Sequence, residues 1–307
     1  MAATDAPAAP DAHATVAREK PLRPRAGAAA IAAGILAFIA GFLPQSIYSD
    51  APHVYVLDSL RDAAGQNIGR PGLTSAQVLF VHDKAGSLLV VAVAQALTAL
   101  LVGVVLVFLF DAASARGATT PRLARLAAMF GAVGSAVAAL MVQIGRMVGA
   151  SDFASSADHG SQAARDALNG GAVLAGGLIG VFAGLALAAA FVMIAIGAMR
   201  VGLLTRFIGV LGAIVGVLFV LGPATGSTTF VVQTFWLIMV GVLLFGSWPG
   251  GAPPAWADGQ AHPWPSQQQR REEREAVRAD APVPATPAPA GTPSPATSAR
   301  KKRKRRG

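Results

Sequence analysis

The sequence has no cysteine and little charge. Of its 307 residues, 13% are charged, against roughly 25% in a typical soluble domain, and only 7% are aromatic. The missing cysteine excludes disulfides, thiolate metal ligands, iron–sulfur clusters and cysteine nucleophiles. The low charge excludes an ordinary soluble protein, because a chain that is 53% hydrophobic needs lipid as its solvent.

Long apolar runs take the place of the missing charge. At 1.5 Å per helical residue, about 20 residues cross the roughly 30 Å of hydrocarbon in a bilayer. We therefore predict an all-α, polytopic membrane protein, a bundle of about six transmembrane helices with disordered termini. No small-x-small cleavage site follows the first run, so we expect it to be an uncleaved span. The predicted spans cover residues 26–43, 86–110, 123–147, 170–199, 203–222 and 229–246.

The predicted transmembrane domain, residues 26–247, lies between segments of different character. Residues 1–25 predict a disordered cytoplasmic N-terminus, and residues 266–307 a charged helix, a Pro-rich linker and a basic tail. Residues 248–265 are rich in Trp and Pro and predict a strap along the membrane surface. Tryptophan favours the headgroup level, so we expect three interfacial anchors, Trp248, Trp256 and Trp264.

The distribution of basic residues predicts the orientation. Without the C-terminal tail, nine Lys and Arg residues fall on the side of the termini and five on the other side, which also carries seven acids. The positive-inside rule then places both termini in the cytoplasm. An even number of spans agrees with termini on one side.

Small residues recur every fourth position along the fourth predicted span. On a helix this spacing forms one smooth face that lets another backbone approach closely. The face fits either self-association or a partner interface, or packing inside the monomer. It consists of Ala172, Gly176, Gly180, Gly184 and Ala188, and weaker faces of this kind include Gly212 with Gly216 and Ala30 with Gly34.

No residue pattern predicts catalysis, a cofactor or a metal. The predicted spans contain no histidine, which argues against haem and against an intramembrane serine protease, and no phosphate-binding glycine motif joins a strand to a helix. We therefore expect a protein that is not an enzyme and holds no cofactor. His and Asp residues of the outer loops lack ligand spacing, and we interpret them as solvated: His53, Asp58, His82, Asp83, Asp158 and His159.

Intramembrane ionisable groups, which usually mark ion or substrate routes, are nearly absent. Gln95, Gln143 and Gln233 are neutral, and we expect them to be satisfied across helices. Arg146 lies close enough to a span end to reach the interface. This pattern argues against a proton-coupled carrier.

The chain ends in a basic cluster. Clustered Lys and Arg bind phosphate without sequence preference, either in nucleic acid or in lipid headgroups. Because this cluster is tethered next to a bilayer, we expect anionic lipid to be its partner rather than nucleic acid. The cluster consists of Lys301, Lys302, Arg303, Lys304, Arg305 and Arg306.

The stretch from Met199 to Ser266 contains MRVGLLTRFIGVLGAIVGVLF, FWLIMVGVLLFGSWPGG and PPAWADGQAHPWPS. It resembles the C-terminal half of uncharacterised multi-pass membrane proteins of high-GC actinobacteria. The resemblance implies a bacterial inner (plasma) membrane protein and carries over no functional residue. We expect a non-enzymatic interaction or auxiliary protein with a possible membrane-protein partner. The alternative is a small-solute or lipid transporter or channel.

Overall fold

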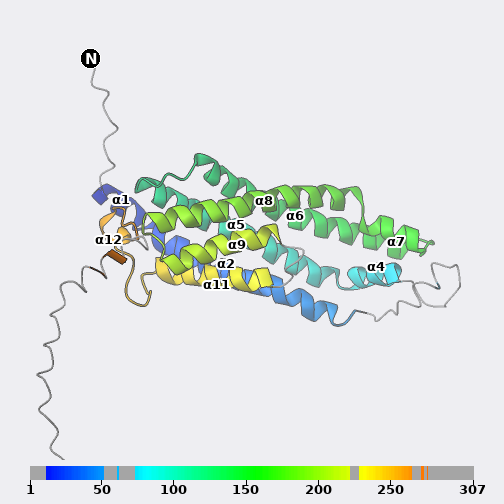
Figure 1. Cartoon of the computed structure of the whole chain (residues 1–307). Helices are drawn as coiled ribbons and strands as arrows, with labels where there is room; N and C mark the ends of the chain where they lie inside the picture. Colours follow the sequence, from blue (N-terminus) through cyan, green and yellow to red (C-terminus); the bar gives the residue numbers. More distant parts are fainter. Residues whose placement is uncertain are drawn as a thin grey trace, which may run out of the picture. The chain divides into compact units, whose positions relative to one another are not determined.

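The computed structural model describes residues 12–51, 61, 73–221, 228–264, 271, 272 and 275. These residues form helices and no strand, so the all-α prediction is confirmed for them. Four helices are long and apolar enough to cross a membrane (Figure 1). They are α2 (Leu22–Tyr48), α5 (Ala85–Ala115), α6 (Arg122–Ser155) and α8 (Gly171–Arg200).

Two further apolar helices are shorter. The helix α9 (Arg206–Val220) has 15 residues and α11 (Thr228–Leu244) has 17. At 1.5 Å per residue they extend about 22 and 25 Å, less than the roughly 30 Å of hydrocarbon. In place of six predicted spans, the described part of the chain has four helices of full spanning length and two short ones.

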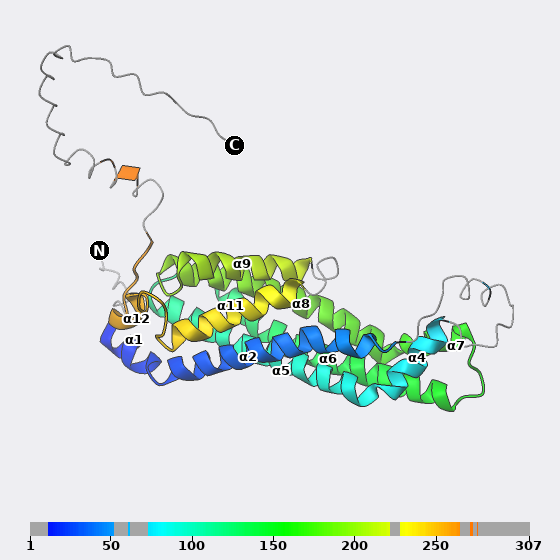
Figure 2. The same cartoon turned by 90° about the horizontal axis from the view of Figure 1, so that it is seen from below.

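The six apolar helices follow one another around a closed ring. Each contacts the next in the order α2, α5, α6, α8, α9 and α11, and α11 returns to contact α2. In both views, α9 and α11 stop short of the far ends of α2, α6 and α8 (Figures 1 and 2). The ring is therefore complete along only part of its length.

At the far end of the long helices lie α4 (Leu73–Asp83) and α7 (Ser161–Leu168), where the sequence suggested only loops. We call this the α7 end. A separate apolar cluster fills it because the ends of α2, α5 and α6 continue past the short helices. The cluster consists of Ile47, Val78, Phe80, Val81, Leu88, Val91, Ala150, Phe153 and Ala164.

The opposite end, called the α12 end, carries α1 (Ala12–Glu19) and the short α12 (Ala255–Asp258). The expectation of disorder up to residue 25 differs from this structure, since residues 12–19 are helical and α2 already begins at Leu22. Tertiary contact explains the difference, because Thr15 and Glu19 are buried. Of the charged segment after residue 265, only residues 271, 272 and 275 are described, and they are helical.

Glycines of α6 allow its close contact with α8. A Cβ atom added at Gly131 would lie 2.6 Å from the backbone nitrogen of Leu187 and 2.9 Å from the carbonyl oxygen of Ala183. One added at Gly134 would lie 2.7 Å from the Cβ of Ala183. Backbone thus approaches backbone, which is how helices associate where lipid leaves no hydrophobic drive.

The small-residue face predicted on α8 meets several neighbours within the chain. A Cβ at Gly176 would lie 3.2 Å from the nitrogen of Val142, and one at Gly180 would lie 3.4 Å from the Cβ of Ala138. Gly184 has no atom within 4 Å of such a Cβ. The outer members face other glycines: Ala172 lies near Gly145 of α6, and Ala188 near Gly216 of α9.

Substituting Gly131→Ala tests the α6–α8 contact. We expect a loss of about 1–3 kcal/mol of unfolding free energy, because the added methyl meets backbone that cannot move aside alone. Thermal unfolding in detergent micelles measures it. Gly184→Ala is the matched control and should cost nothing, since its methyl enters open space; equal losses in both variants would contradict the contact.

Candidate functional site

A cavity of about 540 Å³ lies within the ring, toward the α7 end. Residues of α2, α5, α6 and α8 line it, and Phe219 in the last turn of α9 borders it. Because Phe219 lies in the last turn of α9, the cavity begins where that helix ends. The longer helices continue past this point (Figure 2). Its walls are largely small or apolar, including Leu88, Val91, Ala138, Ala139, Val142, Gly176, Gly180 and Gly184.

Five polar side chains line the cavity without a hydrogen bond to any described residue: Tyr48, Gln95, Ser135, Gln143 and Arg146. Gln143 is only 9% exposed, and its buried Nε2 donates no hydrogen bond. Gln95 is half-buried and Arg146 exposed, and neither has a hydrogen bond or ion pair among the described residues. The expected pairing of the glutamines across helices is therefore wrong for Gln143, which faces a cavity instead.

The chemistry of this wall favours ligands that accept hydrogen bonds. Amide nitrogens of Gln95 and Gln143 donate, and Arg146 adds a permanent positive charge. The lining residues include no Asp or Glu. A carboxylate, phosphate or carbonyl group placed here would meet donors, while its hydrocarbon part would meet apolar walls.

Depth in the bilayer follows from position along α6. Gln143 lies 18 residues from Arg125, which is about 27 Å along a helix. If Arg125 marks one edge of the hydrocarbon, Gln143 lies near the other, where a roughly 30 Å layer ends. The cavity is thus accessible to polar groups from the α7 end without a charge at the bilayer centre.

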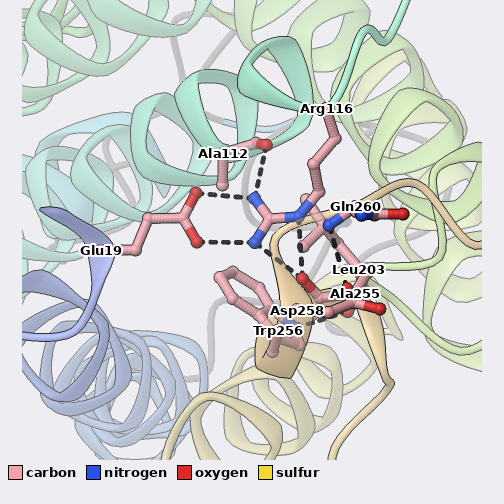
Figure 3. A network of polar contacts seen from close by, with 8 residues as sticks. All are labelled: Glu19, Ala112, Arg116, Leu203, Ala255, Trp256, Asp258 and Gln260. Atoms are coloured by element: carbon pink, nitrogen blue, oxygen red, sulfur yellow. Dashed lines mark hydrogen bonds and ion pairs between the residues drawn. The ribbon is translucent and has the colours of Figure 1, made fainter. Parts of the chain in front are cut away.

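The second polar feature is a buried network at the α12 end, centred on Arg116 (Figure 3). Its Nη1 and Nη2 donate to the two carboxylate oxygens of Glu19 at 2.6 and 2.8 Å. Its Nε and Nη2 donate to the carbonyl of Ala255 at 3.0 and 2.8 Å, and Nη1 also donates to the carbonyl of Ala112. One guanidinium therefore joins α1, α5 and α12.

Trp256 closes this network from the side of α12. Its ring stacks on Phe108 with 5.9 Å between centroids and 6° between planes. The guanidinium carbons of Arg23 and Arg116 lie 4.9 and 5.2 Å from its centroid, which is cation–π geometry. Its Nε1 donates to the carbonyl of Leu203 at 2.9 Å.

The segment after α12 donates hydrogen bonds to backbone carbonyls in the turn between α8 and α9. The nitrogen of His262 donates to the carbonyl of Val201 at 3.0 Å, and Nε1 of Trp264 donates to Leu204 at 3.0 Å. Position 202 requires glycine for two reasons. Its φ of +77° disfavours residues with a side chain, and an added Cβ would collide with the carbonyl of His262. These bonds cover carbonyls that the helix end leaves unpaired.

An exposed carboxylate shapes the loop that follows α12. The backbone nitrogen of Gln260 and the His262 ring both hydrogen-bond to Asp258. These bonds lower the pKa of Asp258, the backbone bond most. Because the pKa is lowered, the loop contacts are fully present above the ordinary value near 4 and are lost only as pH falls through the lowered pKa.

The residues predicted from the sequence as anchors or binding sites differ in their surroundings, and some lie outside the described residues. Trp256 is 4% exposed and faces protein, Trp248 is half-buried, and Trp264 is 39% exposed. The basic cluster at residues 301–306 lies outside the described residues, as do His53 and Asp58. Among described residues, no three His, Asp or Glu side chains gather to hold a metal.

The pair of Arg116 and Glu19 is not predicted from the sequence. There, Arg116 counts only among the basic residues that indicate membrane orientation. The two residues are 97 positions apart, and neither belongs to a recognisable motif. The available signal was the position of Glu19 between Arg18 and Lys20, shortly before the first predicted span.

Substituting Arg116→Leu tests the network. We expect a loss of about 3–5 kcal/mol, because Glu19 would stay buried without its partner. A Glu19→Leu change in the same chain should restore part of the loss. Chemical unfolding in micelles compares the wild type, the single variant and the double variant.

The control is Lys84→Leu, which removes an exposed ion pair with Asp50 and should cost less than about 1 kcal/mol. A loss comparable to that of Arg116→Leu would contradict a special role for Arg116.

What the two features can do differs. The network at the α12 end has almost every donor engaged and can hold segments together, whereas the cavity has unused donors and can hold a ligand. Comparison of the chain with protein-family models, with curated proteins and with solved structures finds no match.

Proposed function

We propose that this membrane protein binds a small solute or a lipid in the cavity between α2, α5, α6 and α8 and passes it between bilayer and solution. The observation that carries the proposal is the buried Nε2 of Gln143, which has no partner and faces the cavity together with Gln95 and Arg146. No covalent chemistry is involved.

Energetics support a ligand at this position. Nε2 of Gln143 has no protein partner, so only water or a ligand can satisfy it, and a buried donor left unsatisfied costs about 1–3 kcal/mol. A ligand that accepts from Gln143 would replace that water and supply the hydrogen bond. Apolar walls around a few donors are the usual composition of small-molecule sites.

The donors also define the ligand class. Gln95, Gln143 and Arg146 favour an anionic or carbonyl-rich group, and the apolar wall favours a hydrocarbon portion next to it. An amphiphile with an acidic head satisfies both. A cation would meet Arg146 and no compensating carboxylate on this wall.

We propose six crossings of the bacterial inner membrane, with both termini in the cytoplasm. Contact between α1 and α12 supports termini on one side, and hence an even number of crossings. The short α9 and α11 would cross as a hairpin, with a locally thinner bilayer making up their missing length.

Cysteine accessibility tests the cavity, since the natural chain has no cysteine. Gln95→Cys and Gln143→Cys should react in intact cells with a charged, membrane-impermeant thiol reagent, because water fills the empty cavity. Val181→Cys, on the exposed lipid-facing side of α8, should stay protected. Adding Gly184→Leu to Gln143→Cys should slow labelling, since the new side chain enters the cavity.

Two outcomes would contradict this proposal. Equal protection of all three cysteines would mean that no aqueous path reaches the cavity. Unchanged labelling after Gly184→Leu would mean that the reagent reaches Gln143 by another route.

The same reagent tests orientation. Ser156→Cys, at the α7 end, should label in intact cells, and Ala257→Cys, at the α12 end, only after the membrane is permeabilised. The reverse pattern would place both termini outside.

A groove at the α7 end supports a second candidate function, that of an interaction or auxiliary protein. A groove of about 830 Å³ borders α6, α7 and the start of α8, and its lining combines apolar residues with Asp152 and Asp166. The basic tail, Lys301 to Arg306, would add binding to anionic lipid or to a partner. Mass spectrometry of protein extracted with native lipid, full-length or ending at Pro265, tests this: a reproducible protein companion supports it, and lipid alone removes it.

A further inference from the structure

A groove of about 610 Å³ runs along the outer surface of α2, α5 and α6, separate from the cavity described above. The floor is α5, and the walls are α2 and α6, each of which contacts α5. Apolar floor residues Leu100 and Val104 are 40% and 54% exposed. A bilayer would cover these side chains, so the groove holds hydrocarbon unless another protein fills it.

Charge gathers at the end of the groove nearest α12. Its polar lining consists of Arg25, Asp111 and Arg125. Nε of Arg125 donates to Oδ1 of Asp111 at 3.0 Å, and its Nη1 contacts the sulfur of Met129. Arg25 is exposed and has no partner among the described residues. The groove end therefore carries one net positive charge with unused donors.

The spacing between charge and apolar floor matches one leaflet. Leu100 lies 11 residues from Asp111 on α5, about 16 Å along a helix. One leaflet of a roughly 30 Å hydrocarbon layer is about 15 Å thick. A phosphate held at Arg25 and Arg125 would thus place an acyl chain over Val104 and end it near Leu100.

Close contact of α5 with α6 gives the groove its depth. A Cβ at Gly103 would lie 2.5 Å from the Cβ of Ala132, so the two helices meet here with no side chain between them. Met129 and Val133, on the neighbouring turns of α6, stand 46% and 55% exposed beside this contact. The acyl chain would lie in the trough between these side chains and α5.

We propose that the groove binds one anionic phospholipid, with its phosphate between Arg25 and Arg125 and an acyl chain along Val104. Guanidinium–phosphate hydrogen bonds are charge-assisted and bidentate, which favours this headgroup at this end. A net positive end favours an acidic lipid over a zwitterionic one, whose own cation would meet the arginines. The site shares no residue with the cavity and does not depend on the proposed function.

Native mass spectrometry of the full-length chain tests the headgroup. The protein is released from nanodiscs of equal parts phosphatidylglycerol and phosphatidylcholine, and retained lipid is counted. Wild type should retain one phosphatidylglycerol in preference. Arg25→Gln with Arg125→Gln should lower its retention roughly 25-fold, since each basic residue near the surface contributes about a factor of five. The matched control, Arg122→Gln with Arg200→Gln, removes equal charge outside the groove and should retain the lipid.

A second arm tests the acyl path. Val104→Trp fills the groove without changing charge and should lower retention of phosphatidylglycerol. If that variant fails to fold, the double variant Arg25→Gln with Arg125→Gln still tests the proposed lipid site. Excess inorganic phosphate should not displace the lipid, because the chain contributes to its binding.

Four results would overturn the proposal. They are no preference between the two lipids, equal loss in the control pair, displacement by phosphate alone, and a bound protein in place of lipid.

Discussion

The cost of an unpaired polar group in hydrocarbon governs this molecule. A helix satisfies its own backbone, so long apolar helices cross without difficulty, but every side-chain donor and every helix end must find a partner. At the α12 end the guanidinium of Arg116 donates to Glu19, Ala112 and Ala255, while the buried Nε of Arg23 has no partner. Toward the α7 end, Gln143 keeps a buried nitrogen without a partner on the wall of a cavity. The two ends of the bundle therefore differ in the space around their polar groups, which is filled at the α12 end and open at the α7 end.

Helix length explains where that difference arises. From the α12 end to the last turn of α9 all six apolar helices are present, and Phe191 contacts both Phe219 and Trp236 at the inner limit of this part. Past Phe219, α9 ends, and only the longer helices continue. Small residues on α6 and α8 then border open space instead of a neighbour. The short length of α9 and α11, rather than any special motif, creates the cavity.

Sequence periodicity and length were enough for the four long helices, because apolar runs of 20 or more residues have one stable form in lipid. The same reasoning overestimated the helix lengths of the last two predicted spans, because their apolar runs extend beyond the helices into turns. It also missed α1, which depends on burying Glu19 against Arg116, a contact across 97 positions. The regular spacing on α8 was visible, yet Gly131 and Gly134 of α6, which allow α6 to approach α8, follow no regular spacing. Which glycine meets a neighbour depends on helix rotation, and periodicity within one helix does not determine that.

The segment from Ala255 to Trp264 has a consequence for biosynthesis. It follows all six apolar helices in the chain, yet it supplies partners to Arg116 and to the carbonyls of Val201, Leu203 and Leu204. Until it is synthesised, a newly inserted bundle has helix ends that this segment does not cover. Closure of the α12 end therefore marks a chain whose six apolar helices are all in place, and a chain cut short before Ala255 would present quality-control proteases with an uncovered end.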